Sequence, residues 1–188
     1  MVLKPQDVLV ALKAALLGPE VRFVFSDVAR SVGLSRSEVH AAVHRCLHAR
    51  LMMRVSHRVD AAAGTNRTNL LEFLLHGIQY AFPPTLGTVT RGVPTGYAAP
   101  VLSNYFAPSA ALPPVWPTVT GHVRGRAFEP LYPSVPVAAS NDADLYSALA
   151  LVDAIRGGGA RDREIAERLL TEMLARPRGA SERQLRHS

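Results

Sequence analysis

Residues 33–38 (GLSRSE) constrain the fold of this chain more than any other stretch. Gly33 follows an apolar-patterned segment, and glycine commonly ends a helix because it tolerates the left-handed backbone found there. Ser35 and Glu38 have the spacing of a capping box, in which each side chain accepts the backbone amide of the other residue. The stretch therefore predicts that one helix ends at Gly33 and that another begins directly after Ser35.

Both flanking segments have the periodicity of amphipathic helices. We expect Ser26 to cap a short helix through Val32. The next helix should run from Arg36 to about Ala49. Its apolar face would carry Val39, Ala42, Val43, Cys46 and Leu47, and its polar face Ser37, His40, Ala41, His44, Arg45 and His48. Two helices joined by so short a turn form a helix-turn-helix.

The surrounding segments extend this unit to residues 1–82. An apolar stripe predicts a first helix that begins near Pro5 and ends at Gly18. Residues 51–59 favour short strands and residues 60–66 a turn, which together would make a basic wing. Asn69 would then open a helix through Phe82 that is apolar nearly all round, as in a central strut or a dimer interface.

The second part of the chain begins with an unusual segment, residues 83–139. Residues 83–137 hold 11 of the 14 prolines, together with aromatic side chains and almost no charge. This composition predicts an ordered, extended segment that wraps over the protein or a partner. Residues 140–176 then predict a helical hairpin for dimer or partner contact, and residues 177–188 a frayed tail. The expected fold class is mainly α.

Composition narrows the class of protein. The 188 residues, 48% hydrophobic with a net charge of +6, are typical of a folded globular chain. A single cysteine excludes an internal disulfide and fits a cytoplasmic protein. No segment has the features of a signal peptide or of a membrane span. Residues 1–70 carry 10 basic and 5 acidic side chains, an excess that phosphate binding would require.

Residues 4–82, taken as a whole pattern, resemble the winged helix-turn-helix domain of MarR-like bacterial transcriptional regulators. The later segments depart from that family and look like those of uncharacterised bacterial winged-helix proteins. The resemblance implies a homodimer on double-stranded DNA, with the third helix in the major groove. It implies base contacts by Arg36, Ser37, His40, Ala41 and His44, and phosphate or minor-groove contacts by Arg30, Arg45, Arg54, Arg58 and Arg67.

Two alternative roles for single side chains receive little support. His40, His44 and His48 share a helix face, but no other ligand is placed to complete a metal site, so we expect no metal or cofactor. Protonation of these histidines should instead make DNA affinity fall as the pH rises through about 6.5. Cys46 lies on the apolar face, which favours packing over redox sensing.

The functional prediction is a DNA-binding regulator that acts as a repressor. We do not expect an enzyme, because the sequence shows no paired acids, nucleophile–base motif or phosphate-binding glycine loop. An alternative is an antitoxin-like or accessory protein whose residues 83–139 bind a partner protein while the winged domain is autoregulatory or does not bind DNA. A small-molecule sensor with a pocket under residues 70–82 also remains open.

Overall fold

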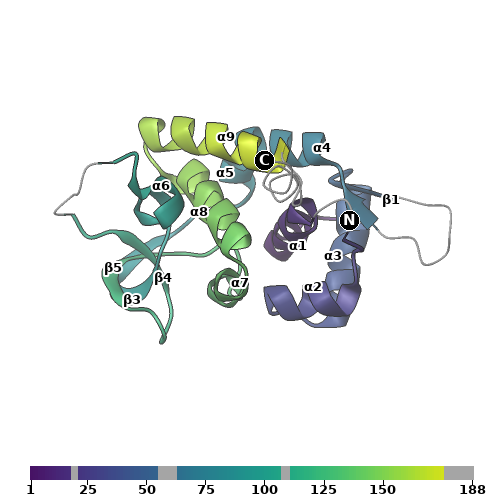
Figure 1. Cartoon of the computed structure of the whole chain (residues 1–188), viewed down its shortest axis with the longest axis horizontal. Coiled ribbons are helices and arrows are strands. Elements are labelled where there is room, and N and C mark those ends of the chain that lie inside the picture. Colours follow the sequence, from purple (N-terminus) through teal and green to yellow (C-terminus); the bar gives the residue numbers. More distant parts are fainter. Residues whose placement is uncertain (18–20, 55–62, 107–110, 176–188) are drawn as a thin grey trace, which may run out of the picture.

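A computed structural model of the chain describes residues 1–17, 21–54, 63–106 and 111–175. Within these ranges the protein is mainly helical with two small sheets, which confirms the predicted mainly-α class (Figure 1). The elements are α1 (Pro5–Leu16), α2 (Phe25–Val32), α3 (Arg36–His48), β1 (Met52–Arg54), β2 (Ala63–Thr65), α4 (Arg67–Glu72), the π-helical turn η1 (Phe73–Gly77), α5 (Ile78–Ala81), β3 (Leu86–Pro94), the 3-10 turn η2 (Gly96–Ala98), α6 (Pro100–Ser103), β4 (Pro114–Pro117), β5 (Val123–Phe128), α7 (Val135–Asn141), α8 (Ala143–Gly157) and α9 (Ala160–Ala175).

Helix α8 occupies the centre of the molecule, between α1 on one side and the strands β3–β5 on the other (Figure 1). Its predicted apolar stripe is buried, and so are Ala148, Ala150, Leu151 and Ala154 on its other faces. Helices α8 and α9 pack against each other as the predicted hairpin, and α8 contributes buried side chains to the chain's own core. None of the described helices is both long and apolar enough to cross a membrane.

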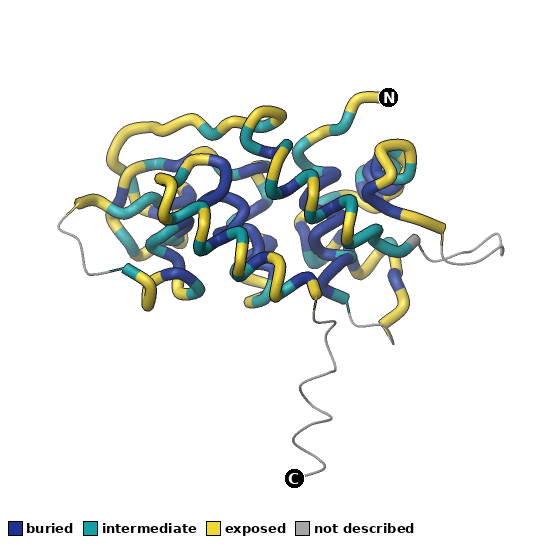
Figure 2. Tube along the Cα trace, turned by 90° about the horizontal axis from the view of Figure 1, so that it is seen from above, coloured by how far each residue is buried: buried dark blue, intermediate teal, exposed yellow. Residues whose placement is uncertain are grey.

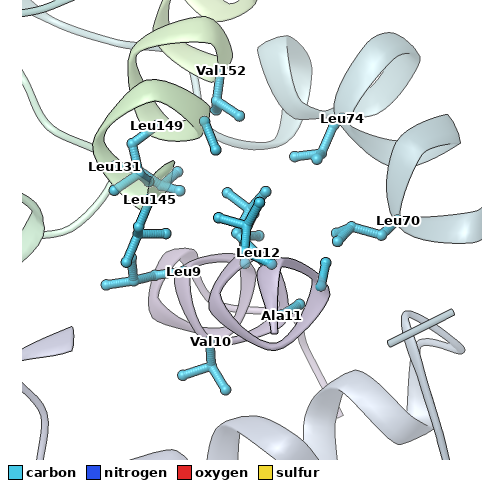
Figure 3. Close-up of a cluster of buried hydrophobic side chains, with 14 of the residues drawn as sticks. Leu9, Val10, Ala11, Leu12, Leu70, Leu74, Leu131, Leu145, Leu149 and Val152 are labelled. Carbon is cyan, nitrogen blue, oxygen red and sulfur yellow. The ribbon is translucent and has the colours of Figure 1, made fainter. Parts of the chain in front are cut away.

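The first and last parts of the chain share one core among the described residues. Figure 3 shows Leu9 of α1 pointing toward Leu131 and Leu145, and Leu12 lying between Leu149 and the side chains of α4 and η1. Figure 2 shows that buried residues, coloured dark blue, lie throughout the interior of the molecule. The predicted boundary at residue 82 therefore does not divide the hydrophobic core.

Residues 83–139 do not form the predicted extended wrap. Strand β3 pairs antiparallel with β4 and β5, and β4 pairs parallel with β5, so the three strands close into a small barrel. A Cβ atom at Gly92 would clash with the carbonyl oxygen of Trp116 in β4. A Cβ atom at Gly125 would clash with the carbonyl oxygen of Pro113, just before β4. The small barrel therefore requires glycine at both positions. The prolines of β3 and β4 lie at strand ends, where a missing amide is tolerated.

Two other predicted helix starts are displaced. Helix α2 begins at Phe25 with Val24 as its N-cap, and not at a Ser26 cap. The helix predicted to be capped by Asn69 is capped three residues earlier, by Asn66, and its first residue is Arg67. The side-chain oxygen of Asn66 accepts the Asn69 amide at 3.2 Å.

The helical segment from α4 to α5 is buried mainly along one side and not all round. Leu70, Leu74 and Ile78 are fully buried, whereas Tyr80 is 78% exposed. The π-helical turn η1 interrupts the segment. The segment therefore covers one side of the core.

A buried polar cluster attaches the barrel to α8. The Asp153 carboxylate accepts hydrogen bonds from Trp116 Nε1 at 2.6 Å and Thr95 Oγ1 at 2.9 Å, and from Arg156 at 2.6 Å. Arg156 also donates to the Phe82 carbonyl at 2.8 Å. Burial raises the pKa of Asp153, and the Arg156 charge and the three donors oppose that rise. Each polar group of the cluster thus has a partner, as burial requires.

Replacing Asp153 by alanine should lower the free energy of unfolding by about 3 to 5 kcal/mol, because Arg156 would remain buried without its counter-charge. Chemical denaturation followed by circular dichroism measures this change. Glu172→Ala, in an exposed pair with Arg168, is the control and should leave the stability nearly unchanged. Equal stability of the two variants would contradict the role of the cluster.

Candidate nucleic-acid interface

Helix α3 begins as the sequence predicts. Gly33 has a left-handed backbone, with φ of 67°, and ends α2. The Glu38 amide donates to Ser35 Oγ at 3.2 Å, and the Ser35 amide donates to Glu38 Oε2 at 2.8 Å. The hydrogen bonds from Ser35 lower the pKa of Glu38. The capping box is confirmed, and it fixes where the first turn of α3 lies.

One face of α3 is locked into the core, as predicted. Val39, Ala42 and Val43 are buried, and Cys46 is fully buried with its Sγ donating to the Asp7 carbonyl at 3.3 Å. Burial raises the pKa of the Cys46 thiol to about 12, so the group is neutral at physiological pH. The packing role predicted for Cys46 is confirmed.

The other face of α3 brings together the residues predicted to contact bases. Arg36, Ser37, His40 and His44 are exposed, and Ala41 is half-buried between them. The imidazole rings of His40 and His44 have centroids 4.6 Å apart. Within the described ranges, no three histidine, cysteine or acidic side chains are grouped to hold a metal ion.

Arg45, predicted as a phosphate contact, is occupied inside the protein. Its Nε and Nη2 donate to the two carboxylate oxygens of Asp7 at 2.7 and 2.6 Å. The Asp7 side chain is 0% exposed and that of Arg45 14%. The hydrogen bonds to Asp7 raise the pKa of Arg45. Arg45 therefore joins α3 to α1, and its guanidinium group is occupied by Asp7 instead of being free for a phosphate.

Arg67 is also used structurally. Its Nη2 donates to the Ala15 carbonyl at 2.7 Å and to the Leu17 carbonyl at 3.4 Å, which satisfies carbonyls at the end of α1. We therefore remove Arg67, like Arg45, from the candidate interface.

Of the remaining predicted arginines, two are exposed. Arg30 makes only a loose contact of 3.5 Å with the exposed Asp27, and Arg54 lies at the end of β1. Arg58 lies outside the described residues.

The hairpin after α3 differs from the predicted strand and turn. Met52 pairs with Thr65 and Arg54 with Ala63, so residues 63–65, predicted as part of the turn, form strand β2. Residues 55–62, which complete the predicted strand and turn, lie outside the described residues. Thr65 Oγ1 donates to the Ala11 carbonyl at 3.2 Å, which attaches the hairpin to α1.

The far part of the chain also positions the α2–α3 pair, which the sequence did not reveal. Ser134, just before α7, donates from Oγ to the Val32 carbonyl at 2.7 Å. Asn141 at the end of α7 donates to the Ser31 carbonyl at 3.3 Å. A Cβ atom on Gly33 would lie 3.1 Å from Ser134 Cβ, so α2 and its turn pack closely against this segment.

Comparison of the chain with protein-family models, with curated proteins and with solved structures finds no match. The functional assignment therefore depends on the residues themselves and on their geometry.

Arg45→Ala should lower the free energy of unfolding by about 3 kcal/mol, because it leaves the buried Asp7 carboxylate without its cation. Arg36→Ala, which removes an exposed arginine from the same helix, should leave stability nearly unchanged. Thermal or urea unfolding of both variants measures the difference. An unchanged stability for Arg45→Ala would return Arg45 to the candidate interface.

Proposed function

We propose that this protein is a sequence-specific, double-stranded DNA-binding transcriptional regulator of the winged helix-turn-helix type, acting as a repressor. The observation that carries the proposal is the division of α3 into a buried face and a polar, exposed face that starts at a capped turn. A recognition helix needs both properties, because its base-reading side chains must be free while its axis is held. The resemblance of residues 4–82 to MarR-like regulators supports the same assignment.

The exposed face of α3 has the side chains that read the major groove. Arg36 in its first turn can donate two hydrogen bonds to a guanine, and Ser37, His40 and His44 can donate or accept. Ala41 can contact the methyl group of a thymine. The ion pair of Arg45 with Asp7 fixes this helix to α1, so that binding costs little reordering of α3.

Arg30 and Arg54 are the described arginines that we assign to phosphate groups, with Arg58 of the hairpin as a further candidate. Contacts to phosphates supply affinity that falls as the salt concentration rises, and they carry little sequence information. We propose that a homodimer binds a two-fold site, which would place two α3 helices about 34 Å apart on one side of the duplex.

The alternative of an antitoxin-like or accessory protein rested on an extended segment at residues 83–139. That segment instead folds into the barrel and short helices and is held to α8 by the cluster around Asp153. Binding of a partner protein by this region stays a prediction that no specific contact favours. The third possibility was a small-molecule sensor with a pocket beneath residues 70–82. The side chains of Leu70, Leu74 and Ile78 fill the core at that position.

Arg36→Ala should reduce discrimination between a specific site and random duplex by about 1 to 3 kcal/mol, because it removes a base contact. Arg54→Ala is the matched variant. It should weaken binding to both duplexes alike and reduce the slope of log affinity against log salt by about 1. Fluorescence anisotropy with both duplexes at several salt concentrations measures these effects. Equal weakening by Arg36→Ala on the two duplexes would assign Arg36 to a phosphate and refute its role in base reading.

A further inference from the structure

A pocket of about 300 Å³ lies between the barrel and the junction of α8 with α9. Its apolar and aromatic walls include Leu86, Tyr97, Leu112 and Phe128. Arg126 of β5 lines the pocket as well, together with Asp153 and Asp162. Apolar walls with a few polar groups are typical of pockets that bind small molecules, and this volume lies within their usual range.

Three arginines form a continuous row on the barrel that starts in this pocket. Arg124 and Arg126 are two residues apart on β5, so their side chains lie on the same face of the strand. Arg91 of β3 lies directly opposite Arg124 in the antiparallel ladder and shares that face. We call Arg91, Arg124 and Arg126 the arginine row.

The arginine row has no internal counter-charge. All three residues are exposed, and within the described part of the chain none of their guanidinium groups has a hydrogen bond or an ion pair. Like charges directly opposite each other destabilise a sheet. Arg91 and Arg124 therefore oppose folding of the barrel, which fits a role in binding an anion.

The acidic groups near the pocket are already engaged. Asp153 is held by three donors, and Asp162 Oδ2 accepts the Gly159 amide at 3.2 Å. Tyr97 brings an aromatic ring to the pocket lining, and burial raises the pKa of its hydroxyl, as does the nearby Asp162 charge, so the hydroxyl stays protonated. The pocket thus suits a flat ring with polar edges, and the arginine row that leads out of the pocket from Arg126 suits several negative charges.

We propose that the pocket and the arginine row together bind a nucleoside polyphosphate. The base would lie in the pocket against Tyr97, and the phosphates would lie along Arg126, Arg124 and Arg91. Arginine is suited to this role because its planar guanidinium group can donate two hydrogen bonds to one phosphate. This site lies on different elements from the candidate DNA interface, and its existence does not depend on DNA binding.

Calorimetric titration of the full chain with ATP, GTP, AMP and tripolyphosphate tests the proposal. ATP or GTP should bind at least about tenfold more tightly than AMP, which does not reach Arg124 and Arg91, and than tripolyphosphate, which does not fill the pocket. Arg91→Gln combined with Arg124→Gln should weaken binding of the triphosphate about tenfold and leave AMP binding within about twofold. Arg126→Gln should weaken both.

Two further variants separate the site from general attraction to positive charge. Tyr97→Ser should weaken triphosphate binding and leave tripolyphosphate binding unchanged. Arg22→Gln removes an exposed arginine outside the site and should change nothing. Circular dichroism and thermal unfolding establish that each variant is folded. The proposal would be overturned if neither ATP nor GTP bound, or if tripolyphosphate bound as tightly as ATP and GTP. Full triphosphate affinity of the Arg126→Gln variant would also overturn it.

Discussion

The salt bridge between Lys13 and Asp142 joins the two halves of the chain inside their shared core. The Lys13 Nζ and the Asp142 carboxylate are 2.6 Å apart, and the two side chains are only 11% and 5% exposed. The same carboxylate accepts the amides of Asp144 and Leu145 and so begins α8. A buried charge is costly unless it is paired, so α1 and the start of α8 must lie in one relative position.

The positions of the other elements follow from this contact. Helix α1 carries Asp7, which holds Arg45 and thus α3, while α8 carries Asp153, which holds the barrel through Trp116 and Thr95. Together, α1 and α8 form a rigid connection between the exposed face of α3 and the pocket at the far end of α8. The segment at α7 adds a second connection, because Ser134 and Asn141 bind the carbonyls at the end of α2.

The sequence predicted the features that depend on local chemistry. The capping box at Ser35, the buried and exposed faces of α3 and the hairpin of α8 with α9 follow from spacing within a helix. The barrel was not predictable, because its strands contain glycine and proline, which are rare in strands, and because β3 pairs with strands more than 20 residues away. The internal roles of Arg45 and Arg67 were hidden for a related reason. An arginine on a polar helix face has the same sequence pattern whether it meets a phosphate, a buried carboxylate or a carbonyl.

The central claim is that the exposed face of α3 reads duplex DNA. Its most direct test is fluorescence anisotropy of the purified full chain with the DNA upstream of its own reading frame and with random duplex of equal length, at two salt concentrations. We expect tighter binding to the upstream DNA and weaker binding to both duplexes at the higher salt concentration. Absence of binding, or equally weak binding to the two duplexes, would contradict it.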